Sequence, residues 1–479
     1  MAEDSTASSL PPLCVDLDDT LLKTDLLFET LLSAVKGNPL SILLIPFWLV
    51  RGRAYLKQRL AVAANIDVNT LPYRSDLLQF LRAEQQRGRR LVLVSAANRT
   101  IAEDVQDHLG LFNEIIASDG TLNIKGRKKA QILEERFGRQ QFDYAGDAHA
   151  DFAVWRSARR ALVVSNRKRF IRAINSIVPV DAVFPKSSGR FALLVNALRL
   201  RQWAKNLLVF IPILTGHKLF DQAILTKGAL AFVSFSLISS GVYLLNDLLD
   251  LESDRAHATK RHRAIAAGEL SIFYASALCV VLLTAGAGVG WFCGATFLLF
   301  VAIYVLSNLA YSMWLKRVVM LDVVVLACFY ALRLLAGGAA TEIGCSDWLL
   351  AFSVFFFFCL AMVKRYSELR SLIGATGTSA PGRGYFPSDL EAIGTFGVGS
   401  GLISVLVLVL YVMSPEVRLL YAQPRLLLLL CPLFLYWITR LWFKAHRGEV
   451  PEDPVVFAMT DRTSYVAGIL AAAVLYAAT

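Results

Sequence analysis

The stretch that decides the fold of the second half of the chain runs from Gly228 to Arg263 and reads GALAFVSFSLISSGVYLLNDLLDLESDRAHATKRHR. Its first part, Gly228–Leu245, contains no charged side chain and is long enough for a helix that crosses a bilayer. Four acids, then four Lys or Arg with two His among them, follow at once. The pattern predicts a membrane span that ends in a charged loop at the membrane surface.

The composition of the whole chain agrees with a membrane protein. Of its 479 residues, 56% are hydrophobic, and the mean hydropathy of +0.51 is too high for an ordinary soluble protein. The seven Cys residues lie mostly in apolar runs and show no CxxC spacing, which argues against a zinc site or a disulfide framework. The N-terminus, MAEDSTASSLPPL, lacks the basic and apolar regions of a signal peptide, so we expect the first domain in the cytosol.

The apolar residues are unevenly distributed along the chain. Residues 1–185 are charged and mixed, and almost everything after Phe191 is apolar runs with short charged loops. We therefore predict a soluble domain at 1–185, a linker and lead-in at 186–198, and an all-helical membrane domain at 199–479. Runs of roughly 17 to 25 residues predict about nine spans, centred near Ile211, Phe235, Leu282, Phe300, Cys328, Phe355, Leu406, Leu430 and Leu470.

The loops predict the orientation of these spans. Numbered alternately, the loops on the side of the N-terminal domain carry about 17 Lys and Arg, against about 4 on the other side. The positive-inside rule then predicts a multi-pass protein of the inner (cytoplasmic) membrane, with the N-terminal domain and the charged loops facing the cytosol. This distribution also explains much of the net charge of +11 without a nucleic-acid partner.

Several short motifs in the soluble domain suggest phosphate chemistry. PLCVDLDDTLL is an apolar strand ending in Asp16, with Asp18 two residues on. Acids at this spacing point the same way from an extended segment, so one carboxylate can attack while the other handles a proton. An acid cluster at a helix start is the alternative. RRLVLVSAANR is a buried strand ending in Ser95, whose hydroxyl could hold a phosphate oxygen.

Two further motifs complete this set. NIKGRKKAQIL offers Lys129 at the start of a helix, with Lys128 as the rival, to neutralise developing phosphoryl charge. FDYAGDAHADFAVW gives Asp147 and Asp151 after a strand, and with Asp16 these acids suit a Mg²⁺ ion.

In this order the motifs resemble the haloacid dehalogenase-like phosphohydrolase family over about Leu13–Val164. The resemblance implies an α/β, Rossmann-like parallel sheet with strands near Leu13, Leu91, Glu114 and Asp143. It also implies that Asp16 is the nucleophile that forms an aspartyl-phosphate and that Asp18 is the general acid and base.

A helical insert between Leu21 and Leu71 would then form a small cap. Within it, NPLSILLIPFWLVRGRAYLKQRLA has an apolar start and a basic continuation. The segment is either a helix packed against the cap or a helix that dips into the membrane interface, where it would hold the phosphatase close to a lipid-borne substrate.

The charged loop after Leu245 is a candidate metal and phosphate site. Asn246, Asp250 and Asp254 are spaced i, i+4, i+8 and would line one stripe of a helix, with Asp247 one face over. Carboxylates in such a row repel one another unless a cation lies among them, and they suit Mg²⁺ bound to a pyrophosphate. The bases expected to meet the phosphates are Arg255, Lys260, Arg261 and Arg263. The alternative is a solvated loop that only fixes topology.

Other polar residues are predicted at the same cytosolic rim. They stand at the ends of the predicted spans, and for several of them a topology anchor is the alternative. The residues expected to bind substrate or phosphate are Arg201, Lys205, Asn206, Tyr311, Lys316, Lys364 and Arg365, and Asp322 is a further candidate metal ligand. Arg333 lies well inside the fifth predicted span, where a charge usually faces the bundle interior.

These residues make the region from about Arg199 to the C-terminus resemble the UbiA superfamily of intramembrane prenyltransferases. Its first signature, NDxxDxxxD, is intact from Asn246 to Asp254, whereas the second departs from the usual DxxxD because Leu326 stands four residues after Asp322. The segments QWAKNLLVF, YSMWLKRVVMLDVVV, LRLLAGG and KRYSEL resemble the decaprenyl-phosphate phosphoribosyltransferase branch. That resemblance implies Mg²⁺, phosphoribosyl pyrophosphate as donor and a polyprenyl phosphate as acceptor.

The two halves together predict a bifunctional enzyme that makes polyprenyl-phosphoryl ribose by transfer and then dephosphorylation, with Mg²⁺ in both domains. The phosphate of the lipid acceptor would lie near Lys205 or Lys364. One alternative is a transferase that moves a prenyl group from a prenyl pyrophosphate to an aromatic acceptor. Another is a non-catalytic transporter or scaffold whose basic rim binds anionic lipid. The length of the polyprenyl chain and the oligomeric state are not predicted.

Overall fold

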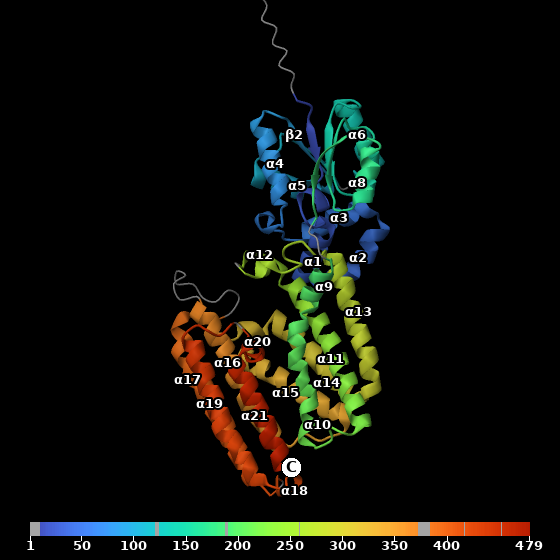
Figure 1. Cartoon of the computed structure of the whole chain (residues 1–479). Coiled ribbons are helices and arrows are strands. Elements are labelled where there is room, and N and C mark those ends of the chain that lie inside the picture. Colours follow the sequence, from blue (N-terminus) through green and yellow to red (C-terminus); the bar gives the residue numbers. More distant parts are fainter. Residues whose placement is uncertain are drawn as a thin grey trace, which may run out of the picture. The chain divides into compact units, whose positions relative to one another are not determined.

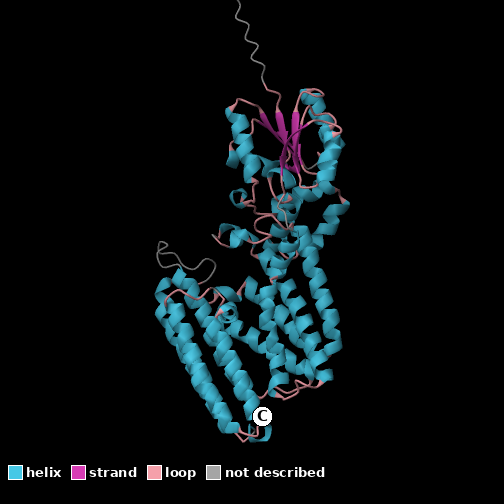
Figure 2. Ribbon diagram, viewed as in Figure 1, coloured by secondary structure: helices cyan, strands magenta, loops and turns pink. Residues whose placement is uncertain are grey.

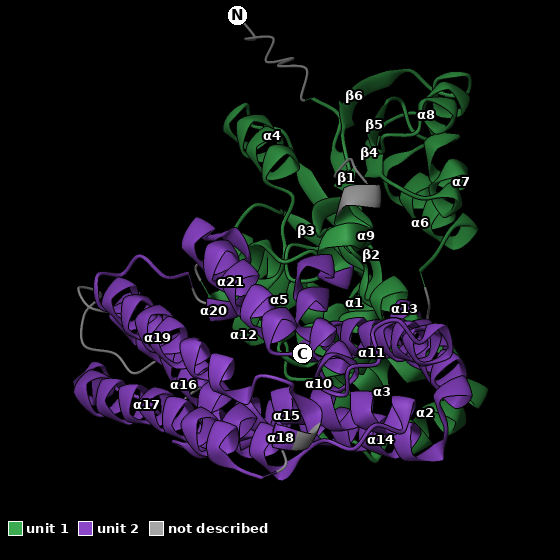
Figure 3. Cartoon of the chain, turned by 60° about the horizontal axis from the view of Figure 1, so that its bottom comes forward, with its two compact units in different colours: residues 1–197, 247–277 green, residues 198–246, 278–479 purple. Residues whose placement is uncertain are grey.

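The computed structural model describes residues 10–119, 124–186, 190–257, 259–371, 384–415, 417–451 and 453–479. The chain, shown whole in Figure 1, folds into two compact units, coloured in Figure 3. Unit 1 consists of Met1–Ala197 with Asp247–Ala277, and unit 2 of Leu198–Asn246 with Leu278–Thr479. Unit 1 therefore contains the predicted soluble domain together with the charged loop that was predicted to belong to the membrane domain. Residues 187–189 of the predicted linker lie outside the described residues.

Unit 1 is built around a β-sheet, drawn in magenta in Figure 2. The sheet has six parallel strands in the order β3-β2-β1-β4-β5-β6. Its strands are β1 (Leu13–Val15), β2 (Leu91–Asn98), β3 (Glu114–Ser118), β4 (Asp143–Gly146), β5 (Ala161–Val164) and β6 (Val180–Phe184). The central strand β1 pairs with both β2 and β4, so that Leu13 lies opposite Leu91 and Asp143. The prediction of a Rossmann-like parallel sheet, with strands near Leu13, Leu91, Glu114 and Asp143, is confirmed.

Both faces of the sheet are covered because alternate residues of each strand point to opposite faces. Leu13 and Val15 belong to one core, which includes residues of α4 (Ser75–Gln86) and α5 (Arg99–Leu109). Cys14, between them, belongs to the other core, formed with α6 (Arg127–Phe137), α7 (Phe152–Trp155) and α8 (Lys168–Asn175). This layering leaves the carboxyl ends of the central strands open for a site.

The insert between β1 and β2 is helical, as predicted. After a turn with Asp19 in the left-handed region (φ 55°), it contains α1 (Leu26–Gly37), α2 (Ser41–Val50), α3 (Arg53–Ala63) and the short helix η2 (Val68–Thr70). An isolated bridge between Leu22 and Tyr73 closes its base. The loop 247–277 adds α12 (Leu251–Ala256) and η5 (Lys260–His262) to the same unit.

Seven helices of the described residues are long and apolar enough to cross a membrane. They are α11 (Gln222–Leu249), α13 (Ile272–Gly290), α14 (Ala295–Met313), α15 (Leu321–Thr341), α16 (Asp347–Ser371), α17 (Leu390–Met413) and α19 (Leu430–His446), three of them lengthened by short 3₁₀ turns. The prediction of about nine such helices is therefore corrected to seven.

The two differences lie at the ends of the membrane region. Around Ile211 the chain forms three short pieces, α9 (Arg190–Leu198), η4 (Leu200–Phe210) and α10 (Ile211–Thr215), because Arg199 takes a left-handed conformation (φ 51°) that ends the first helix. Near Leu470, α21 (Arg462–Ala478) has 17 residues and follows the short helix α20 (Pro454–Thr460).

In unit 2 the backbones of α15 and η4 approach each other closely, as is common where helices pack in a membrane. A Cβ at Gly337 of α15 would lie 2.2 Å from the carbonyl oxygen of Val209 in η4, so only glycine fits there. This contact fixes the broken segment around Val209 against the interior of the bundle, although the segment is not one continuous helix.

Candidate active sites

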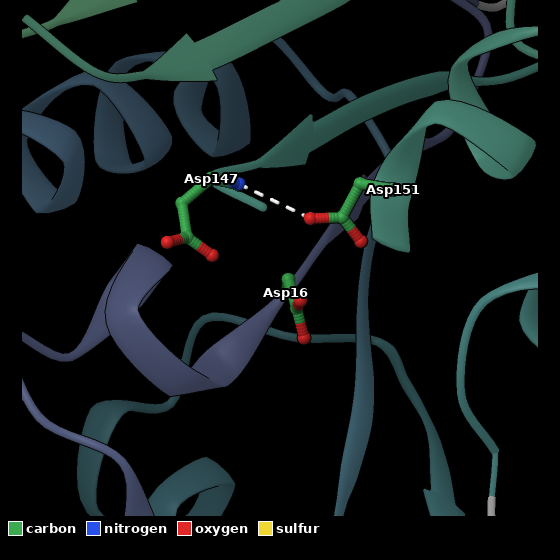
Figure 4. Close-up of side chains that lie close together, drawn as sticks. All are labelled: Asp16, Asp147 and Asp151. Carbon is green, nitrogen blue, oxygen red and sulfur yellow. Dashed lines mark hydrogen bonds between the residues drawn. The ribbon is translucent and has the colours of Figure 1, made fainter. Parts of the chain in front are cut away.

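Three carboxylates meet at the carboxyl edge of the sheet in unit 1. Asp16 directly follows β1, and Asp147 and Asp151 follow β4, so the parallel pairing of these strands brings them together (Figure 4). One carboxylate oxygen from each lies within 4.8 Å of the others. Asp151 Oδ2 accepts hydrogen bonds from the backbone N–H groups of Asp147 (3.2 Å) and Ala148 (3.0 Å), which fixes its orientation. A convergent set of oxygen ligands of this kind fits Mg²⁺.

A buried lysine lies against the predicted nucleophile. Lys129 Nζ is 2.9 Å from Asp16 Oδ1 and donates to the Tyr144 hydroxyl at 3.0 Å. The same oxygen of Asp16 accepts from the backbone N–H of Leu17 at 2.9 Å. Lys128, the rival in the sequence, is exposed. The geometry therefore favours Lys129 as the cation that would meet a phosphoryl group.

Asp16 and Asp18 both line a cavity of about 330 Å³ between the sheet edge and the cap. Asp18 Oδ1 accepts from the backbone N–H of Leu26 at 2.9 Å, at the start of α1. Burial, helped by the nearby Asp25 carboxylate, raises the pKa of the Asp18 carboxyl to about 8. A carboxyl with a raised pKa can carry a proton near neutral pH, as a general acid does.

Ser95 and three residues that sequence reasoning missed complete this site. Ser95 is fully buried in β2, and its hydroxyl accepts from the backbone N–H of Ala97 at 2.9 Å. Lys57 of the cap lines the cavity and donates to the carbonyl of Ala96 at 2.6 Å. Lys186 donates to Asp147 Oδ2 at 2.6 Å, and Tyr144 to Asp151 Oδ1 at 2.9 Å. Of these three residues, only Lys186 could have been found from the sequence, because it follows β6 closely and so lies at the carboxyl edge of the sheet.

The NDxxDxxxD segment is not the single helix that its spacing predicted. Helix α11 ends at Leu249, and Asp250 (φ −94°, ψ 8°) separates it from α12, although Asp254 N still donates to Asp250 O at 2.8 Å. Within unit 1, Arg263 Nη1 bridges Asp247 Oδ1 (3.0 Å) and Asp254 Oδ2 (2.6 Å). Two of the predicted metal-binding carboxylates thus already surround one cation. Carboxylates are ligands that suit Mg²⁺, so the binding of a divalent ion by these residues stays a prediction.

Asn246, the first residue of the signature, belongs to unit 2. Its side-chain carbonyl accepts from the Ser312 hydroxyl of α14 at 2.6 Å. The bond orients the amide at the end of the span.

Arg255, predicted to meet phosphate, is bound to an acid of the cap. Its guanidinium donates to both carboxylate oxygens of Glu29, at 2.6 and 3.2 Å, and to the carbonyl of Ala266 at 3.2 Å. The two side chains are 4% and 6% exposed. Sequence reasoning did not single out Glu29. All the donor groups of Arg255 face protein in this structure, so phosphate binding by Arg255 stays a prediction that would require these contacts to break.

Further contacts join the loop 247–277 to the same surface of unit 1. Lys36 pairs with Glu252 at 3.0 Å, and both are partly exposed. Gly268 (φ 69°) lies so close to the cap that a Cβ would meet Lys23 Cβ at 2.6 Å. Lys260 is half-buried and Arg261 exposed on the loop.

In unit 2, three predicted residues form one buried network. Arg365 donates to Asp322 Oδ2 at 2.5 Å and to the Tyr311 hydroxyl at 3.1 Å, and also pairs with Glu368. The hydroxyl of Tyr385, which was not predicted, donates to Asp322 Oδ1 at 2.5 Å. Both oxygens of Asp322 thus have protein partners, so its predicted metal role would require this network to open.

The remaining residues that were predicted in unit 2 lie outside this network. Lys205 Nζ donates to Asp453 Oδ2 at 2.5 Å, and Asn206 is fully buried between Ser236 and Arg333. Arg333 is buried, as expected for a charge inside a span. Lys316 and Lys364 are half-buried, and Arg201 is exposed. Asp453, the partner of Lys205, lies 248 residues further along the chain and was not predicted.

The first prediction from this geometry concerns the two adjacent lysines. Replacing Lys129 with Ala removes the cation beside Asp16 and should lower hydrolysis of p-nitrophenyl phosphate at least 100-fold. Replacing the exposed Lys128 with Ala serves as the control and should change the rate less than twofold. The full-length protein is assayed in detergent with Mg²⁺. A larger loss with Lys128→Ala than with Lys129→Ala would contradict the assignment.

The second prediction concerns the buried pair. Glu29→Ala leaves Arg255 buried without its carboxylate, a change that costs about 3 kcal/mol or more. Backbone amides of α12 should then exchange hydrogen on the order of 100 times faster, as measured by mass spectrometry. Lys36→Ala breaks the exposed pair with Glu252 and should leave that exchange within about threefold. Unchanged exchange in Glu29→Ala would show that the pair does not hold the loop.

Comparisons with known proteins extend over both units. The model of the UbiA prenyltransferase family matches residues 209–460, more than half of the chain, and that of the haloacid dehalogenase-like hydrolases matches residues 13–156. An uncharacterized protein of Sinorhizobium fredii, y4nM, is 39% identical over 465 residues, which are 96% of this chain and 90% of that protein.

Other similarities cover only part of the chain. The decaprenyl-phosphate phosphoribosyltransferase of Mycobacterium tuberculosis is 38% identical over 193 residues, 40% of this chain and 64% of that enzyme. A solved UbiA homolog from Archaeoglobus fulgidus, bound to GPP and Mg²⁺, covers 59% of this chain and 97% of its own, with 16% identity and a TM-score of 0.46. The chain belongs to the UbiA prenyltransferase family, and it carries a haloacid dehalogenase-like hydrolase domain fused before the membrane region.

Proposed function

We propose that the protein transfers 5-phosphoribose from phosphoribosyl pyrophosphate to a polyprenyl phosphate and then removes the 5-phosphate, which yields polyprenyl-phosphoryl ribose. One structural observation carries the coupling of the two steps. The compact unit with the Asp16 site also contains Asp247, Asp250 and Asp254, three of the four residues of the transferase signature. Sites joined in this way raise the local concentration of one site's product at the other.

The choice of donor is supported by the asymmetry between the two signature positions. The first keeps all its polar residues, whereas in the second Leu326 replaces an acid and Asp322 is engaged by Arg365 and Tyr385. A site with one complete acidic segment suits one compact pyrophosphate donor. The partial match to the decaprenyl-phosphate phosphoribosyltransferase supports the same donor and a polyprenyl phosphate acceptor.

In the transfer step, the bond between the anomeric carbon and pyrophosphate breaks, and an oxygen of the polyprenyl phosphate forms the new bond to that carbon. Mg²⁺ held by Asp247, Asp250 and Asp254 would neutralise the leaving pyrophosphate. Arg263, which already bridges two of these acids, together with Lys260 and Arg261, meets the phosphates. The acceptor is already anionic, so it needs positioning more than deprotonation, and Lys205 or Lys364 would provide it.

In the hydrolytic step, Asp16 attacks the 5-phosphate and the ribose oxygen leaves with the proton of Asp18. Water then cleaves the aspartyl-phosphate after Asp18 takes one of its protons. Lys129 stabilises the charge on the phosphoryl oxygens, and Ser95 lies behind them. Mg²⁺ at Asp16, Asp147 and Asp151 would offset the repulsion between these carboxylates and the phosphate.

Both active sites face the cytosol in this proposal. In this proposal the two parts of unit 1, before and after the segment 198–246, both lie in the cytosol, so that segment would cross the membrane twice. Helix α11 would supply one crossing. The broken segment Leu200–Thr215 would supply the other, although neither of its two helices is long enough to cross a membrane by itself. The excess of Lys and Arg in the loops supports the inner membrane with this face toward the cytosol.

The proposal predicts a phosphorylated product when the hydrolase is disabled. Full-length protein is given polyprenyl phosphate, phosphoribosyl pyrophosphate and Mg²⁺, and the lipids are analysed by mass spectrometry. The wild type should yield polyprenyl-phosphoryl ribose, whereas Asp16→Asn should yield the same lipid heavier by one phosphoryl group. Equal dephosphorylation by Asp16→Asn would disprove the coupling of the two steps.

The transferase signature gives a separate prediction. Asp250→Ala removes one of the acids that hold the donor's metal and should lower pyrophosphate release at least 100-fold, while hydrolysis of p-nitrophenyl phosphate is retained. Glu269→Ala, at an exposed acid of the same loop outside the signature, is the matched control. Full transfer by Asp250→Ala would refute the metal assignment, and transfer only from a prenyl pyrophosphate would refute the donor.

A further inference from the structure

Helix α2 presents an apolar surface to the outside of unit 1. Its ten residues, Ser41–Val50, carry no charge, and most of its large side chains are exposed, with Phe47 at 69% and Val50 at 88%. Ile45 and Trp48 are its contacts with the cluster of α1 and α3 that includes Leu56. The helix thus packs against the cap through one side, as one of the two predictions had it, while most of its large side chains lie on the surface of unit 1.

This apolar surface continues into the hydrolase cavity. Leu49 is half exposed and at the same time lines the cavity that contains Asp16 and Asp18. Arg53 and Leu56 extend the same wall from α3. A substrate with an apolar tail and a phosphate could thus keep the tail along α2 while the phosphate reaches the carboxylates.

The surroundings of α2 have the charge expected near anionic lipid. From Thr30 to Ile66 the chain contains no acid and five bases, namely Lys36, Arg51, Arg53, Lys57 and Arg59. Arg51 and Arg59 are exposed, and Arg59 lies over the ring of Trp48 at 5.7 Å. Basic side chains beside an apolar helix are attracted to the anionic surface of a cytoplasmic leaflet.

Chain connectivity ties this part of unit 1 to the membrane. The unit includes the end of α11 and the beginning of α13, both candidate spans. Phe28 of α1 contacts Phe273 at the start of α13, with ring centroids 5.3 Å apart. Because α2 packs against α1, the apolar surface belongs to the part of the unit that joins the spans.

We propose that α2 lies in the boundary between headgroups and acyl chains of the bilayer and delivers lipid-borne phosphomonoesters to the Asp16 cavity along Leu49. Ten residues of helix are about 15 Å long, too short for a hydrocarbon core of about 30 Å, so α2 lies in the interface and does not span. The identity of the lipid substrate rests on the proposed function, whereas the contact with the bilayer does not.

The contact is tested by photo-crosslinking. p-Benzoylphenylalanine replaces Phe47 in the full-length protein, which is placed in nanodiscs of phosphatidylglycerol and phosphatidylcholine. The same probe at Ile177, an exposed apolar residue next to α8, is the control. Lipid adducts at position 47 should exceed those at 177 at least tenfold. Adducts with peptide, from this chain or a second copy, or no excess of lipid adducts, would overturn the proposal.

Delivery of substrate is tested by charged substitutions that avoid the cavity. Leu43→Glu combined with Val50→Glu should lower hydrolysis of a bilayer-borne lipid phosphomonoester at least tenfold and leave soluble p-nitrophenyl phosphate within twofold. Ile177→Glu should change neither rate. Equal loss on both substrates, or on neither, would overturn delivery by α2. Lipid adducts at position 47 without any hydrolysis of lipid phosphomonoesters would instead refute the proposed function and support the contact with the bilayer.

Discussion

The buried pair between Glu29 and Arg255 is the interaction on which the organisation of unit 1 depends. Each charge is costly to bury alone, so the cap and the loop 247–277 are most stable when they are folded together. The loop also carries Asp247 and Asp254, which both pair with Arg263. A pairing inside unit 1 therefore helps to hold the segment that carries most of the predicted transferase signature.

Unit 2 satisfies its buried charges in the same way. Arg365 with Asp322, and Arg333 with Asn206, place polar groups opposite one another among apolar helices, where an unpaired charge is costly. Such networks restrict which residues remain available to a substrate. They explain why the polar residues predicted at the rim are divided between groups that face protein and groups, such as Arg201, that are exposed.

Much of the hydrolase site was predictable from the sequence because its signals are local. An apolar strand followed by Asp16, and another followed by Asp147 and Asp151, indicates both the parallel sheet and the edge where the acids meet. The partners of the other polar residues were not predictable, since Glu29 and Arg255 are 226 residues apart and no periodicity connects them. The breaks at Arg199 and Asp250 were missed because apolar content reports length and not backbone conformation.

The division of unit 1 between two separate parts of the chain has a consequence for any attempt to separate the two units. A shortened chain ending at residue 197 would contain the whole sheet and cap but would leave Glu29 facing solvent without Arg255, and Gly268 would no longer cover Lys23. No single cut in the chain therefore separates the two units.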